Sequence, residues 1–360
     1  MPSTELTREG ARAMAVCNAC RYCEQYCPVF PAMEQRRVFT AADLNYLANL
    51  CHNCGECLYA CQYAAPHEFM INIPRTLAKV RVQSYAEYAW PRPLAAAFRR
   101  SNLATGVGLF VLLMAVMLAA AFAGNGGVMR DAGNAADFYS VVPHDVMVGL
   151  FGGVGLFVLI ALAIGVRRCW RDLGRPRGSV AAMRDVLTLR NLHATGPDCV
   201  TAEEVRMPLR RWFHHATFYG FGLCFASTTV AAIYHTFFGW PAPYGYSSLP
   251  VLLGAAGGFG LIVGPAGLWS VRAQRDPMLT DPSQEGLDRG FLALLLLTSA
   301  TGLLLLVLRE QSFMGLLLIV HLAAVLALFL TLPYGKFVHG FYRTLALMKS
   351  AAEADRPVID

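Results

Sequence analysis

The apolar residues of this chain are concentrated in its last two thirds. Long apolar runs alternate with short polar segments after Asn102, whereas the first hundred positions are polar and rich in cysteine. A helix needs roughly 20 apolar residues to cross a bilayer. Six stretches have that length: 103–123, 146–166, 214–238, 250–270, 290–309 and 313–333. Since a backbone in lipid must satisfy its own hydrogen bonds, the pattern predicts six membrane-spanning helices.

The contrast between the two parts predicts an α-helical protein with two domains. We expect a cytoplasmic ferredoxin-type domain over residues 1–90 and a six-span membrane domain over residues 91–350. The composition agrees, because 56% hydrophobic and 15% charged residues make the chain more apolar than an ordinary soluble protein. Small-residue spacing lets membrane helices approach closely, and it occurs at Gly149 and Gly153, Gly254 and Gly258, and Gly260 and Gly264.

The distribution of charge predicts the orientation in the membrane. Arginines are frequent between Arg167 and Arg211, in the segment that joins the second and third spans. Basic loops stay on the cytoplasmic side, and an even number of spans then places both termini there. The first 14 residues lack the apolar core of a secretory signal. We therefore expect a multi-pass protein of the bacterial inner (cytoplasmic) membrane, and we interpret the net charge of +6 as a topology signal rather than as a nucleic-acid site.

Eight of the 11 cysteines lie between Cys17 and Cys61, in two copies of one spacing. The first copy, C-x2-C-x2-C-x3-C-P, ends at Pro28, and the second has Gln62 in place of the proline. This is the spacing of a ferredoxin with two clusters, in which the fourth cysteine of each run binds the other cluster. We predict two [4Fe–4S] clusters with crossed ligands. The predicted ligands are Cys17, Cys20, Cys23 and Cys61 for the first cluster site, and Cys51, Cys54, Cys57 and Cys27 for the second cluster site.

A pair of zinc sites is the alternative for these cysteines, although zinc usually takes two C-x2-C pairs separated by a long gap. The other three cysteines, Cys169, Cys199 and Cys224, show no ligand spacing, and we assign them no chemistry. His52 and His67 flank the second run, and we expect them to be exposed or packing residues.

Histidines in the membrane domain are candidate haem ligands, because ionisable side chains within membrane spans are costly and often functional. The topology places His214 and His215 at the same cytoplasmic depth as His339, while His235 and His321 lie toward the outer side. Each depth-matched pair has the arrangement that holds a haem iron between two helices. We therefore predict one or two haem b groups.

The helical phase favours His214 over His215 as a ligand, because residues advance about 100° each around a helix. Pro333 interrupts the sixth helix, so both members of the pair remain candidates. The alternative for each histidine is an interfacial residue that hydrogen-bonds backbone or lipid headgroups. His144 and His193 lack a partner at matching depth, and we expect them at the surface or interface.

Several longer segments resemble one known family. They read C-H-N-C-G-E-C-L-Y-A-C-Q-Y at 51–63, P-H-E-F at 66–69, R-R-W-F-H-H-A-T-F-Y-G-F at 210–221, T-T-V-A-A-I-Y-H at 228–235 and G-P-A-G-L at 264–268. Together they are similar to the tricarballylate or citrate utilisation protein B family, over most of the chain. The resemblance implies an oxidoreductase electron-transfer subunit. Such a subunit reoxidises a flavin-dependent dehydrogenase that converts tricarballylate to cis-aconitate, and passes the electrons to membrane quinone.

The residues themselves support this division of labour. The N-terminal part is too small and too rich in cysteine to hold a flavin domain, and no G-x-G-x-x-G follows a strand. We therefore expect a cytoplasmic FAD-dependent dehydrogenase as partner, membrane lipid and quinone as further contacts, no nucleic acid, and no catalytic acid, base or nucleophile in this chain. Three alternatives remain: a redox-sensing membrane transporter, the electron module of a flavin enzyme of cobalamin synthesis, and an enzyme that itself acts on a corrinoid-like substrate.

Overall fold

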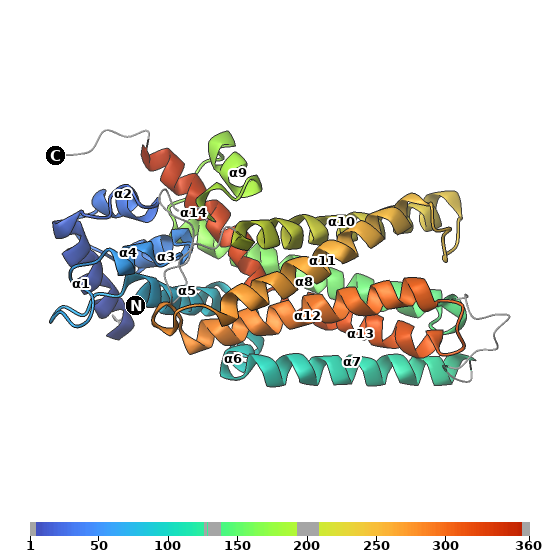
Figure 1. The fold of residues 1–360 in the computed structure, drawn as a ribbon. Coiled ribbons are helices and arrows are strands. Elements are labelled where there is room, and N and C mark those ends of the chain that lie inside the picture. The colour runs from blue at the N-terminus through green and yellow to red at the C-terminus, as the bar shows by residue number, and fades with distance from the viewer. Residues whose placement is uncertain (1–4, 126–127, 129–137, 193–208, 355–360) are drawn as a thin grey trace.

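The structure is a computed structural model that describes residues 5–125, 128, 138–192 and 209–354. Its regular elements are helices throughout, and these described ranges contain no strand. Figure 1 shows a compact group of short helices at one end and a bundle of long helices that extends from it. The predicted α-helical fold, with a short-helix domain ahead of a membrane bundle, is confirmed.

The N-terminal domain contains α1 (Glu5–Cys20), α2 (Val29–Glu34), α3 (Ala41–Leu50), α4 (Glu56–Tyr59) and α5 (Ile73–Tyr88). Its core includes the fully buried side chains of Met14, Phe30, Leu47 and Leu77. A capping box between Thr40 and Asp43 starts α3, because each of these side chains bonds the other's backbone N–H. The cysteines lie at the helix ends and in the loops between them, so the apolar core positions the loops that carry the thiols.

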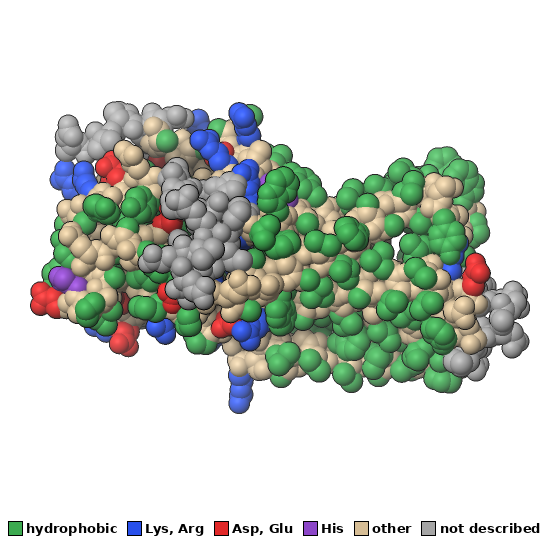
Figure 2. Space-filling view, viewed as in Figure 1, with side chains coloured by type: hydrophobic (Ala, Val, Ile, Leu, Met, Phe, Trp, Pro, Cys, Tyr) green, Lys and Arg blue, Asp and Glu red, His purple; other side chains and the backbone are tan. Residues whose placement is uncertain are grey.

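Six helices are long and apolar enough to cross a membrane, and together they cover all six predicted stretches. They are α7 (Asn102–Asn125), α8 (His144–Asp172), α10 (Leu209–Phe238), α11 (Leu249–Ala273), α12 (Pro282–Leu308) and α13 (Met314–Thr331). Hydrophobic side chains cover the visible face of the bundle, whereas charged side chains gather toward the N-terminal domain (Figure 2). The chain is therefore a membrane protein.

Close packing between α10 and α11 depends on glycine. A Cβ atom built on Gly257 would lie 2.7 Å from the backbone nitrogen of Cys224, and one on Gly260 would lie 2.9 Å from the carbonyl oxygen of Ala216. The prediction that Gly149 and Gly153 pack helices is wrong, because both have open space where a Cβ would stand. They lie on an exposed face of α8, which the bundle leaves toward lipid.

Shorter helices lie before, between and after the spans: α6 (Arg92–Arg100), η1 (Phe138–Ser140), α9 (Val180–Leu187), η2 (Arg190–Leu192), η3 (Pro277–Leu279), η4 (Lys336–Val338) and α14 (His339–Ala354). The sixth span ends at Thr331, two residues before Pro333, and the chain then turns into α14. Our prediction assigned this last segment to the membrane domain. In the structure α14 packs against α8 and α9 of that predicted domain and also against α2 and α3 of the N-terminal domain, where Glu353 bonds Arg36 at 2.6 Å and Tyr46 at 3.0 Å.

Candidate functional site

The thiols of the first cluster site lie together in the N-terminal domain. Burial, together with the neighbouring thiols of Cys61, Cys23 and Cys20, raises the pKa of Cys17 to about 12. Gln62, which stands where the first run has proline, places its side-chain nitrogen 3.9 Å from the sulfur of Cys20. Cys61 therefore lies with the first run of cysteines, although it belongs to the second run in sequence.

The second cluster site shows the reciprocal arrangement. Burial raises the pKa of Cys27 well above the usual thiol value, and the nearest thiols that add to this effect are Cys54 and Cys51. The pKa of Cys57 is likewise raised, first by burial and then by the same three thiols, and the Cys23 thiol of the first site also contributes. The two sites are therefore neighbours. A small cavity is lined by all four thiols of this site together with Val29, Phe30, Ile73 and Pro74.

These two groups of thiols suit an iron–sulfur cubane. Metal binding requires thiolates, and a buried thiol with a raised pKa needs a nearby cation to become one. In the part of the chain that the structure describes, no three Cys, His, Asp or Glu side chains converge closely enough to hold a single metal ion. Four thiolates of a cubane each bind a different iron, so they surround the cluster rather than converge on one point.

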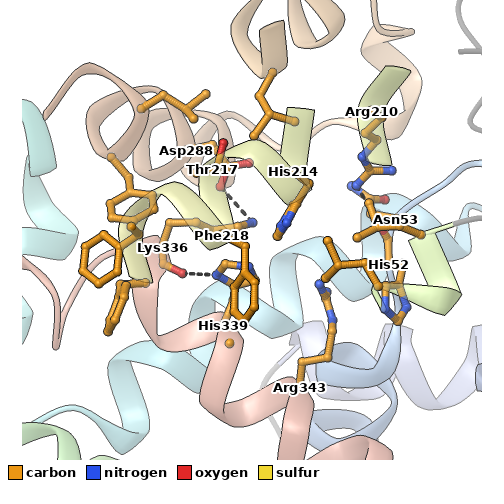
Figure 3. Close-up of a pocket in the computed structure, with 18 of the residues that line it drawn as sticks. His52, Asn53, Arg210, His214, Thr217, Phe218, Asp288, Lys336, His339 and Arg343 are labelled. Carbon is orange, nitrogen blue, oxygen red and sulfur yellow. Dashed lines mark hydrogen bonds and ion pairs between the residues drawn. The ribbon is translucent and has the colours of Figure 1, made fainter. Parts of the chain in front are cut away.

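A larger cavity of about 510 Å³ lies where the N-terminal domain meets α10, α11 and α12. His214 of α10 and His339 of α14 extend into it, as Figure 3 shows. Their ring centres are 6.0 Å apart and their planes meet at 76°. Phe218, Phe221 and Phe337 supply part of its apolar wall, so the cavity combines a histidine pair with an aromatic lining.

The two histidines have nitrogens available for a metal. The Nδ1 atom of His339 donates to the Lys336 carbonyl at 2.6 Å, which leaves Nε2 as the acceptor and orients the ring. Burial lowers the pKa of His339 well below its usual value, and Lys336 and Arg343 lower it further, so the imidazole is neutral, the form that binds metals. The Nδ1 atom of His214 is buried and has no hydrogen-bond partner among the described residues.

Haem b fits these residues. Two imidazoles that bind one metal from opposite sides have ring centres about 6 Å apart, since each metal–nitrogen bond is about 2 Å long. The observed separation of 6.0 Å agrees. The volume lies within the usual range of ligand pockets, and the lining beside the aromatic wall includes Arg210 together with Arg272 and Lys336, two cations that share the single carboxylate of Asp288.

The other predicted histidines lie elsewhere. His215 turns away from the cavity, and its Nε2 atom lies 3.2 Å from the Thr188 carbonyl. The structure does not place the rings of His235 and His321 in contact with each other. His235 stacks on His144, with ring centres 4.3 Å apart, and His321 lies 3.0 Å from the Thr301 hydroxyl. His144 thus has a ring partner that depth matching did not anticipate, and His193 and Cys199 lie outside the described residues.

Sequence reasoning missed the role of His52 and Asn53. Both line the small cavity of the second cluster site and also the large histidine cavity. We expected His52 to be an exposed or packing residue; at 8% exposed it is buried, as the packing alternative requires, and its Nδ1 atom has no hydrogen-bond partner in the described ranges. Its position between two candidate ligand cysteines, in the run Cys51-His52-Asn53-Cys54, was the one available signal.

A helical membrane protein whose N-terminal domain carries two groups of four thiols belongs to the class of membrane proteins with a ferredoxin-like domain. Comparison with known families agrees with this class. Residues 10–87 match the family described as "Citrate utilization protein B Fer4-like domain", and residues 96–360 match the family described as "Citrate utilization protein B".

A curated relative extends the comparison to nearly the whole chain. The Escherichia coli protein named "Citrate utilization protein B" is 49% identical over 359 residues, which covers 98% of this chain and 94% of that protein. The chain therefore belongs to the citrate utilization protein B family, and the resemblance noted from its motifs is confirmed. No solved structure matches it.

Proposed function

We propose that this chain is the membrane electron-transfer subunit of an oxidoreductase system. It accepts electrons from a cytoplasmic FAD-dependent dehydrogenase and passes them through two [4Fe–4S] clusters and haem b to the quinone pool. The clusters and the haem, when bound, supply one-electron redox chemistry. In this proposal the protein lies in the bacterial inner membrane with both termini in the cytoplasm.

One observation carries the proposal: the His52–Asn53 turn lines both the second cluster site and the cavity of His214 and His339. A single turn of backbone therefore separates the candidate cluster site from the candidate haem site. The first cluster site neighbours the second, since the Cys23 thiol raises the pKa of Cys57, and none of its four cysteines lines the histidine cavity. The three sites thus form a row from the N-terminal domain to the start of the membrane bundle.

The residues of this chain have distinct tasks in the proposed path. The eight cysteines of the two cluster sites hold the clusters. His214 and His339 hold the haem iron, and the bond from His339 to Lys336 keeps its ring in place. The apolar residues around the second cluster site, such as Phe30 and Ile73, limit the access of water to it.

The family name supports citrate utilisation as the metabolic role, because the Escherichia coli relative carries that name. We propose that the electron donor is a dehydrogenase of the tricarballylate or citrate type. The reaction that it catalyses takes place on the partner, since the described residues offer two cluster sites and a histidine cavity as the candidate redox sites.

An anaerobic absorption spectrum of the purified protein tests the proposal. The dithionite-reduced minus oxidised difference should contain b-type haem bands, and the same sample should contain about eight non-haem irons with equal acid-labile sulfide. Addition of a soluble quinone to the reduced protein should restore the oxidised spectrum. Clusters without haem bands would contradict the histidine site, and the absence of labile sulfide would contradict the whole proposal.

A further inference from the structure

Four arginines converge on the backbone of three consecutive residues in the second cluster site. The Cys51 carbonyl accepts from Arg81 at 2.7 Å and from Arg343 at 2.8 Å. The His52 carbonyl accepts a hydrogen bond from Arg210 at 3.0 Å, and the Asn53 carbonyl accepts one from Arg275. We call Arg81, Arg210, Arg275 and Arg343 the arginine cradle.

The four members of the cradle come from separate parts of the chain. Arg81 lies on α5 of the N-terminal domain, Arg210 at the start of α10, Arg275 just after α11, and Arg343 on α14. Figure 3 shows Arg210 and Arg343 approaching from different sides to the place where His52 and Asn53 lie. This convergence surrounds one side of the cluster-binding turn with positive charge.

Arg81 is the buried member of the cradle, and Arg343 is half-buried. Arg81 is 1% exposed, and its partners are the Ala48 and Cys51 carbonyls and the amide oxygen of Gln284. Within the described ranges neither Arg81 nor Arg343 forms an ion pair, whereas Arg272 and Lys336 both pair with Asp288 nearby. Buried cations are costly unless a negative charge compensates them.

A [4Fe–4S] core with four thiolate ligands carries a net negative charge, and each added electron increases it. A fixed positive charge therefore favours the reduced form and raises the reduction potential. The pKa of Arg343 supports this proximity, because burial and Arg81 lower it to about 10 while Cys51 acts to raise it. At the first cluster site the charges that act on Cys17 are those of the neighbouring thiols.

We propose that the arginine cradle raises the reduction potential of the second cluster above that of the first, and so directs electrons toward the membrane domain. This inference rests on the proposed function, because it requires both clusters. The four arginines are positioning residues: they act through the backbone and the electric field and do not bind iron. The difference between the two sites gives the electron path its direction.

The test is an anaerobic redox titration of the purified full-length protein, followed by electron paramagnetic resonance. Arg275→Gln and Arg343→Gln should each lower the higher of the two cluster midpoint potentials toward the lower one, which should not move. A tenfold change in the electron distribution corresponds to about 59 mV for a one-electron centre. Arg343→Lys keeps the charge and should restore most of the potential, which a merely structural role would not predict.

Arg99→Gln is the matched control, because Arg99 is exposed on α6. This substitution should leave both potentials unchanged. Iron and sulfide are measured on every variant, so loss of a cluster is not mistaken for a shift. Unchanged potentials in both Gln variants at full cluster content would overturn the proposal, as would a shift of the lower potential alone. Dithionite and mediators replace the donor and the haem, so the result does not depend on either.

Discussion

The imidazole of His214 on α10 faces that of His339 on α14, with ring centres 6.0 Å apart. The two residues are far apart in sequence and lie at the ends of different helices. Their pairing requires the chain to turn after Thr331, since a continuous sixth helix would carry His339 away from this cavity.

Replacement of either histidine should remove the proposed haem. We expect His214→Ala and His339→Ala each to lose most of the b-type absorbance per protein, because one of the two proposed ligands is gone, while labile sulfide stays constant. His215→Ala is the matched control, since the His215 ring contacts the Thr188 carbonyl outside the cavity. This variant should leave the spectrum intact. Haem loss in His215→Ala together with retention in His214→Ala would reverse the assignment.

The crossed arrangement of cysteines can be tested by comparing single serine variants. Cys27→Ser should remove the same paramagnetic signal as Cys54→Ser, and Cys61→Ser the same signal as Cys20→Ser. Each variant should lower the iron content from about eight toward about four. If the ligands are not crossed, Cys27→Ser will instead match Cys20→Ser. Cys169→Ser, at a buried thiol outside both sites, should retain all the iron.

The close contact of α10 and α11 predicts opposite effects at two glycines. Gly257→Ala should lower the thermal midpoint of the detergent-solubilised protein, because its Cβ would lie 2.7 Å from the Cys224 nitrogen. Overpacking of this kind costs about 1–3 kcal/mol. Gly149→Ala has open space and should be neutral or stabilising, since alanine favours a helix over glycine by about 1 kcal/mol. Equal midpoints for the two variants would contradict the packing.

The bond between α14 and the N-terminal domain should contribute to stability. Glu353 accepts from Arg36 at 2.6 Å and from Tyr46 at 3.0 Å, and the ion pair is mostly buried. Glu353→Gln should reduce the free energy of unfolding by about 2 kcal/mol, because hydrogen bonds to charged groups contribute about that much. Thermal unfolding measures the effect. Glu310→Gln, at an exposed position, is the control. An equal loss of stability in that variant would contradict a specific contribution from the Glu353 contacts.

Much of the architecture was predictable because it is encoded locally. A run of apolar residues long enough to cross a bilayer identifies a span without knowledge of its neighbours, and all six were found. The cysteine runs are local in the same way, because the spacing within each run is that of a two-cluster ferredoxin. The small-residue spacing correctly identified Gly260 and Gly264 as sites of close helix contact, but the prediction for Gly149 failed, since nothing in the sequence says which helix face meets a neighbour.

The sequence by itself therefore determined the helical class, the six spans and the residue types available for redox chemistry. Only the tertiary structure decided that His214 faces His339 while His215 does not, that His52 and Asn53 stand between two cavities, and that four arginines from different segments reach the same turn. These relationships join residues that are distant along the chain. They depend on how helices cross and where the chain turns, and the free energy of that packing is spread over many side chains rather than encoded in any one motif.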